Sequence, residues 1–173
     1  MLKRIKKEYL RFIRRQFYRY EDEITGSKVL ENVYKRKSNK RVLISYLQRP
    51  FLVPFDNSHT NWLECKIAAD IFDELGFIVD VVNFTTSGRS INYKKYEIIY
   101  GGGSPVTQAL NKSVKTILYS PGCSSVYQRR ATLNALHRFL FKSGYCAWDS
   151  IRLCEDVLEQ YGLSDLIITL GNS

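Results

Sequence analysis

The chain has little of what marks a metal enzyme, a disulfide-bonded protein or a membrane-spanning protein. Its 173 residues include only two histidines and four cysteines, and no two cysteines have the C-x-x-C spacing of a zinc or redox site. No apolar run approaches the ~18 residues that a membrane span needs. We therefore expect a reduced, cytoplasmic protein without a metal or another cofactor.

Two nucleotide-binding motifs and one hydrolase motif are also missing. The stretch "GGGSPV" has Val106 where the dinucleotide pattern G-x-G-x-x-G requires glycine. Neither a Walker-type phosphate loop nor the G-x-S-x-G elbow of many hydrolases occurs. Gly101, Gly102 and Gly103 have two readings that the sequence leaves open: a close approach of the backbone to a ligand, or a tight turn between a strand and a helix.

The excess of positive charge is confined to the N-terminal part of the chain. The net charge is +9. Residues 1–41 contain 14 Lys and Arg against 5 Asp and Glu, whereas residues 42–173 contain 12 of each kind. Because the larger part is electrically balanced, a nucleic-acid groove across it is disfavoured.

The basic excess lies in a segment whose pattern predicts an amphipathic helix over residues 1–20. Apolar residues recur there at spacings of mostly three and four, with Lys and Arg between them. Such a helix can lie on an anionic membrane surface at the inner face of the membrane. The alternative is a helix that packs its apolar stripe on its own domain. Residues 21–40 read as a polar linker.

From residue 41 onward, short apolar runs alternate with helical patterns. Strands are predicted at residues 41–47, 77–84, 96–102, 114–120 and 165–171, and helices at about 61–75, 105–110, 126–141 and 150–161. Gly76 follows the first of these helices as a stop signal. The sequence predicts an α/β, Rossmann-like parallel sheet with helices on both faces over residues 41–173, preceded by a separate segment over residues 1–40.

Ligands of such sheets bind beyond the carboxyl ends of the strands, and the loop that ends in "NSHTNWLECK" (residues 57–66) lies there. Ser58, Thr60 and Asn61 can each cap a helix that starts near Trp62, and Glu64 lies at capping-box distance from Asn61. Capping accounts for Thr60, Asn61 and Glu64 without a ligand. His59 has no capping role. It is a candidate general base or hydrogen-bond donor to a ligand.

The stretch "VLISYLQRPFLVPFDNSHTNWLECKIAADIFDELGFIVDVVNF" resembles the start of a bacterial glycosyltransferase of the two-Rossmann (GT-B) type. The residues that carry the resemblance are Ser58, His59, Thr60, Asn61, Glu64, Ile67 and Ala68, followed by Glu74, Leu75, Gly76, Phe77, Val79, Asp80 and Val81. Further matches are Tyr119, Gly122, Gln128 and Ala131, and the final "DLIITLGN". The similarity covers about residues 41–173.

The resemblance implies transfer of a sugar from a nucleotide sugar to an acceptor hydroxyl, such as that of a cell-envelope glycan or a lipid-linked sugar. In that family the N-terminal domain mostly holds the acceptor and the C-terminal domain binds the nucleotide sugar. The sequence ends at Ser173, before a donor-binding domain. We therefore expect a chain that is inactive alone and binds a nucleotide sugar only together with that domain or a partner subunit.

Applied residue by residue, the resemblance assigns His59 to acceptor contact or base catalysis. Asn61 and Glu64 would organise the acceptor loop, and Gly101, Gly102, Gly103 and Gly122 would line the substrate-binding cleft. The competing hypothesis is a non-catalytic Rossmann-like binding module that lacks the donor domain.

Overall fold

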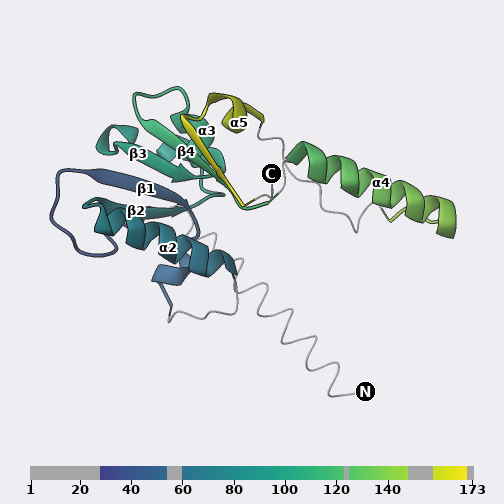
Figure 1. Ribbon diagram of the computed structural model, residues 1–173, viewed down its shortest axis with the longest axis horizontal. Coiled ribbons are helices and arrows are strands. Elements are labelled where there is room, and N and C mark those ends of the chain that lie inside the picture. Colours follow the sequence, from purple (N-terminus) through teal and green to yellow (C-terminus); the bar gives the residue numbers. More distant parts are fainter. Residues whose placement is uncertain (1–27, 54–59, 123–124, 148–157, 171–173) are drawn as a thin grey trace, which may run out of the picture.

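The computed structural model describes residues 28–53, 60–122, 125–147 and 158–170. Its centre is a sheet of five parallel strands in the order β2-β1-β3-β4-β5 (Figure 1). The strands are β1 (Arg41–Tyr46), β2 (Ile78–Asn83), β3 (Ile98–Gly101), β4 (Lys115–Ser120) and β5 (Leu166–Thr169). The predicted α/β, Rossmann-like fold class is confirmed.

Only 3-10 turns lie between β2 and β3, whereas helices follow β1, β3 and β4, as the sequence pattern predicted. The helices are α2 (Thr60–Glu74), α3 (Ser104–Ala109), α4 (Ser125–Ser143) and α5 (Leu158–Leu163). Three short 3-10 turns, η1 (Arg49–Phe51), η2 (Gly88–Ser90) and η3 (Tyr93–Lys95), lie in the loops. The predicted helix over residues 1–20, and part of the one predicted at 150–161, fall outside the described residues.

Helix α2 covers one face of the sheet because its apolar residues recur on one side. Its buried residues are Cys65, Ala68, Ala69 and Phe72, and they pack with Val42 and Val79 in one core cluster. Gly76 ends the helical segment with a φ of +87°, a conformation that glycine adopts without strain. Burial of each large apolar side chain here contributes about 1.5 to 3 kcal/mol.

The opposite face is covered by α3 and by the segment before β3. Val106 and Ala109 of α3 pack with Leu43, Val82 and Ile99 in a second cluster. Because the helix after β1 and the helix after β3 lie on opposite faces, the chain reverses its winding between these two neighbouring strands (Figure 1).

The two edges of the sheet differ in how they are covered. At β2, Leu30 exchanges backbone hydrogen bonds with Val81 in an antiparallel bridge. At β5, all four residues are exposed. The prediction of helices on both faces thus holds for the middle of the sheet, whereas β5 is left open because α4, which precedes it, does not lie over it (Figure 1).

Candidate functional site

The carboxyl ends of β1 and β3 define the place where the chain's winding reverses. In open parallel sheets this is where ligands bind, since the loops on either side diverge and leave a crevice. Three described segments meet at this end of the sheet: the first turns of α2, the turn between β3 and α3, and the end of β4.

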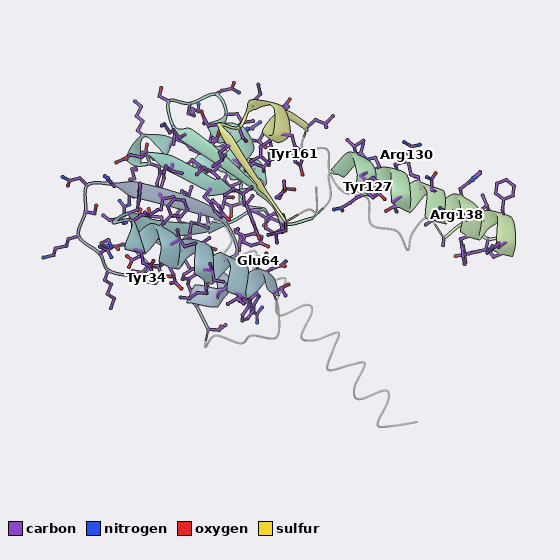
Figure 2. The ribbon with its side chains drawn as sticks, viewed as in Figure 1. Tyr34, Glu64, Tyr127, Arg130, Arg138 and Tyr161 are labelled. Carbon is purple, nitrogen blue, oxygen red and sulfur yellow. The ribbon has the colours of Figure 1, made fainter. Side chains whose placement is uncertain are left out.

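Glu64 is a charged group at this edge. It lies on α2, half-buried, and Tyr46 at the end of β1 donates a hydrogen bond of 2.9 Å from its hydroxyl to Glu64 Oε2 (Figure 2). The ring of Tyr119 packs edge-on against Tyr46 at 5.7 Å between centroids, and the ring of Tyr100 stacks on Tyr119 at 5.6 Å. A carboxylate thus stands beside a row of three tyrosines, one from each central strand.

The two tyrosines nearest to Glu64 hold their protons tightly. Burial, followed by the charge of Glu64, raises the pKa of Tyr119 to about 12. Burial and the hydrogen bond to Glu64 also raise the pKa of Tyr46 above its ordinary value. At neutral pH both hydroxyls are therefore donors that can point at an oxygen, and neither can act as a base.

Gly101 and Gly103 are required by the chain itself. Gly101 has a φ of +121°, and a Cβ there would lie 2.0 Å from the carbonyl oxygen of Ser45. Gly103 has a φ of +76°, and a Cβ there would lie 2.0 Å from the carbonyl oxygen of Phe84. The tight turn between β3 and α3 therefore accounts for both glycines.

Gly102, between them, is different. A Cβ there would meet only ordinary contacts at 3.9 Å. Its backbone is fixed to β1, because its N–H donates to the carbonyl of Ser45 at 3.0 Å and its carbonyl accepts from Ser45 Oγ at 2.7 Å. Gly102 therefore presents a rigid backbone next to the end of β1.

The end of β4 adds hydroxyl groups to the same edge. Ser120 Oγ contacts the hydroxyl of Tyr161 and donates to the carbonyl of Gly122. The buried Gln160 donates from Nε2 to Thr107 Oγ1 at 2.7 Å and to the carbonyl of Gly103 at 3.2 Å. These bonds tie α5 to the turn between β3 and α3.

The residues predicted from sequence are placed as follows. His59 lies outside the described residues. Asn61 lies inside α2, so the predicted capping role for it is wrong: the helix already includes Thr60. Glu64 reaches the end of β1, and Gly101 to Gly103 form the neighbouring turn. Gly122 is exposed beyond β4, where an added Cβ would come within 3.0 Å of Gln128 Nε2.

Sequence reasoning placed the loop that begins at Ser120 among those beyond the carboxyl ends of the strands, but it gave Tyr46, Tyr119 and Tyr161 no role in the site. Tyr46 and Tyr119 lie at or next to the carboxyl ends of β1 and β4, so the same rule could have singled them out. Their meeting with Glu64, and that of Ser120 with Tyr161, depends on strand order, which the local pattern does not contain.

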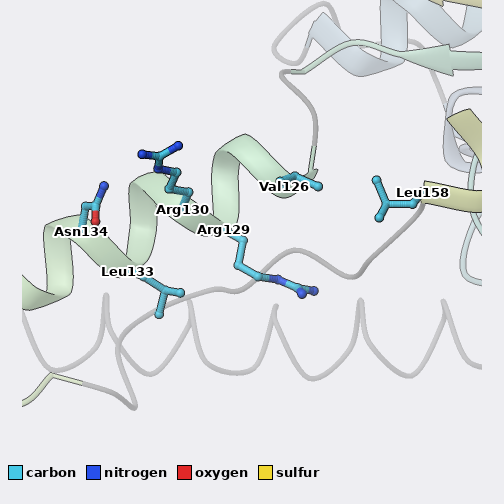
Figure 3. Close-up of a pocket in the computed structure, with 6 residues that line it drawn as sticks. All are labelled: Val126, Arg129, Arg130, Leu133, Asn134 and Leu158. Atoms are coloured by element: carbon cyan, nitrogen blue, oxygen red, sulfur yellow. The ribbon is translucent and has the colours of Figure 1, made fainter.

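A separate hollow of about 480 Å³ lies along α4 and is lined by Val126, Arg129, Arg130, Leu133, Asn134 and Leu158 (Figure 3). Among the described residues, none of those predicted for the acceptor site lines it. Within the described ranges, no group of three or more His, Cys, Asp or Glu side chains could hold a metal ion. In the same ranges, no helix has the length and apolar character needed to cross a bilayer.

Comparisons with protein-family models, with curated proteins and with solved structures give no match for this chain. The site is therefore interpreted from its own geometry.

Proposed function

We propose that this chain is the acceptor-side half of a glycosyltransferase, which transfers a sugar from a nucleotide sugar to an acceptor hydroxyl once a donor-binding domain is supplied. The observation that carries the proposal is the position of Glu64. Its carboxylate accepts the hydroxyl of Tyr46 at the end of β1, the strand beside which the chain reverses its winding.

In this proposal Glu64 orients the acceptor. A carboxylate accepts hydrogen bonds from sugar hydroxyls, and Tyr46 fixes the position of Glu64 through its own hydroxyl. Asn61, Gly122 and the turn from Gly101 to Gly103 border the acceptor.

His59 is the proposed base of the transfer step. It removes the proton of the acceptor hydroxyl as that oxygen bonds to the anomeric carbon, while the bond from this carbon to the nucleoside diphosphate breaks. The diphosphate leaves with the electron pair of the broken bond and remains with the donor domain.

The acceptor is a cell-envelope glycan or a lipid-linked sugar in this proposal. Residues 1–20, with their basic and apolar pattern, would hold the chain against an anionic membrane surface. Nucleic acid is not the proposed partner, because positive and negative charges balance over residues 42–173.

A matched pair of variants tests the role of Glu64. Asp70 lies on the same helix and also accepts a tyrosine hydroxyl, that of Tyr34, but it lies further along α2, away from the carboxyl ends of the strands. We expect Glu64→Gln to lower sugar transfer by about 100-fold, and Asp70→Asn to change it less than about twofold. The assay measures transfer of labelled sugar from a panel of nucleotide sugars by the chain mixed with a donor-binding domain.

His59→Ala is measured in the same assay. Transfer by this variant at the wild-type rate would remove His59 from the mechanism, and equal losses in Glu64→Gln and Asp70→Asn would remove Glu64.

A non-catalytic binding module is the second candidate. It is favoured by the finding that Gly101 and Gly103 are explained by contacts within the chain. It predicts saccharide or partner binding, but no transfer with any donor-binding domain added.

A further inference from the structure

Helix α2 has a second apolar row, apart from the residues that it buries against the sheet. The members of this row recur every four residues and are between 45% and 62% exposed; they are Leu63, Ile67, Ile71 and, directly after the helix, Leu75. Residues four apart lie on one side of a helix and form a ridge that fits a groove of another helix. A continuous exposed row of this kind marks an interaction surface.

The charge along this row has one sign. The exposed positions of α2 are Thr60, Leu63, Ile67, Asp70, Ile71 and Glu74, and none of them is Lys or Arg. Lys66, the basic residue of α2, is half-buried over the rings of Tyr34 and Phe51. Among the described residues, no Lys or Arg forms an ion pair with Asp70 or Glu74. This outer face of α2 is apolar and acidic, so its partner should be apolar and basic.

The N-terminal segment of the same chain has that composition. Residues 1–20 contain eight Lys and Arg and one Glu. Their apolar residues include Leu2, Ile5, Tyr9, Ile13 and Phe17, at spacings of three and four. This pattern predicts an amphipathic helix with an apolar stripe on one side and basic residues on the other.

The residues that follow this segment lie beside α2. Tyr34 donates from its hydroxyl to Asp70, and Arg36 Nε donates to Asp73 Oδ1 at 2.6 Å (Figure 2). Residues 21–27 connect the segment to the described chain, and seven residues span up to about 25 Å when extended. Helix α2, with 15 residues, is about 22 Å long. Residues 1–20 can therefore reach the outer face of α2 in the same copy of the chain.

We propose that residues 1–20 dock on the outer face of α2 of the same copy. Their apolar stripe packs on the row that includes Ile67 and Ile71, and their basic residues lie beside Asp70 and Glu74. The contact removes apolar side chains of both segments from water and brings opposite charges together. A docked stripe is not available to a bilayer, so α2 and an anionic membrane compete for residues 1–20. Only this competition rests on the proposed function.

Two other contacts fit the charges less well. Helix α4 also exposes apolar side chains, but its charged residues are all basic, so it would repel residues 1–20. A symmetric contact between two copies through the outer face of α2 would place Asp70 and Glu74 against their own counterparts. Residues 1–20 match both the apolar and the acidic part of this face.

The test is limited trypsin digestion of the full chain, because trypsin cleaves after the Lys and Arg residues of segment 1–20. Protection is the cleavage rate of a synthetic peptide of residues 1–27 divided by the rate at the same bonds in the chain, both followed by mass spectrometry. We expect at least about tenfold protection in the wild type and none in Ile67→Asp/Ile71→Asp. The matched control, Leu133→Asp/Leu140→Asp, changes two exposed apolar residues of α4 and should stay within about twofold of the wild type.

Two further variants test the charges and the segment itself. Glu74→Lys should lower protection about threefold in about 20 mM NaCl and much less in about 500 mM NaCl. Its control is Glu97→Lys, which makes the same charge change at an exposed position outside α2. Ile13→Asn/Phe17→Asn, compared with a peptide that carries the same changes, should lose protection. Circular dichroism melting checks that each variant folds.

The proposal is overturned if the wild-type chain is cleaved as fast as the peptide, or if Ile67→Asp/Ile71→Asp keeps the wild-type protection. Loss of protection in the α4 variant alone would assign the contact to α4 and overturn it as well. Protection that disappears on dilution, together with a dimer in analytical ultracentrifugation, would overturn docking within one copy. The digestion contains no lipid, saccharide or nucleotide sugar, so this proposal and the proposed sugar transfer fail separately.

Discussion

Helices α2 and α4 each follow a strand of the same sheet, and only α2 packs against it. Four residues of α2 are buried, and Phe72 is 8% exposed. In α4, no residue with a described side chain is buried, and Phe141 is 77% exposed. Apolar side chains on a helix indicate that the helix packs against some surface. Whether that surface belongs to the same domain depends on the fold.

The charges of the two helices follow the same division. Helix α2 carries Glu64, Asp70, Asp73 and Glu74 against Lys66, and three of these carboxylates bind groups of the chain, namely Tyr46, Tyr34 and Arg36. The charged residues of helix α4 are all basic. The acidic residues of α2 thus bind groups of the same domain, whereas α4 projects away from it.

The largest difference between α2 and α4 is expected when one phenylalanine side chain is removed from each helix. Phe72→Ala should lower the free energy of unfolding by about 3 to 5 kcal/mol, because it empties space between Phe77 and Tyr100. Phe141→Ala should change it by less than about 0.5 kcal/mol. Urea denaturation measures both. A loss above about 2 kcal/mol in Phe141→Ala would mean that α4 packs on the domain in solution.

The two cysteines with described surroundings give a comparison by thiol reactivity. Cys65 of α2 is buried, and burial raises the pKa of its thiol to about 12. Cys146, just beyond α4, is exposed. We expect Cys65 to react with a maleimide at least about 100-fold more slowly than Cys146 at pH 7.5. Peptide mapping by mass spectrometry resolves the two sites, and comparable rates would contradict the packing of α2.

A smaller effect is expected from Tyr119→Phe, on the face of the sheet that α2 covers. Burial and the charge of Glu64 raise the pKa of Tyr119 to about 12, above the value of about 10 in an unfolded chain. Its contribution to stability is therefore complete below pH 10 and is lost as the pH rises from 10 to 12. The variant should lose about 1 kcal/mol at pH 8.

Between pH 10 and 12, the stability of Tyr119→Phe should fall less steeply than that of the wild type. Urea denaturation at several alkaline pH values measures the two slopes. Parallel pH dependences would show that Tyr119 titrates as it does in the unfolded chain.

The sheet could be predicted from sequence because its strands are short apolar runs. All five predicted strands contain the observed ones, for example residues 77–84 around Ile78–Asn83. Helix α2 was equally predictable, because Cys65, Ala69 and Phe72 recur on one side and Gly76 follows.

Other features depended on contacts between distant parts of the chain. Glu64 fits a capping box in sequence, yet it binds Tyr46, which only the packing of α2 on β1 brings close. The turn at Gly101 and Gly103 is explained by the carbonyl oxygens of Ser45 and Phe84, which belong to other segments. The exposure of α4 could not be predicted, because helical periodicity does not name the surface that a helix contacts.

The central claim, that the sheet edge at Glu64 binds a saccharide acceptor, is tested most directly by NMR. Amide resonances of the full, isotope-labelled chain are followed during titration with a panel of mono- and disaccharides. The account predicts shifts at Glu64 and at Gly101 to Gly103 that vanish in Glu64→Gln and persist in Asp70→Asn. Shifts confined to other residues, or shifts at this edge that survive Glu64→Gln unchanged, would contradict it.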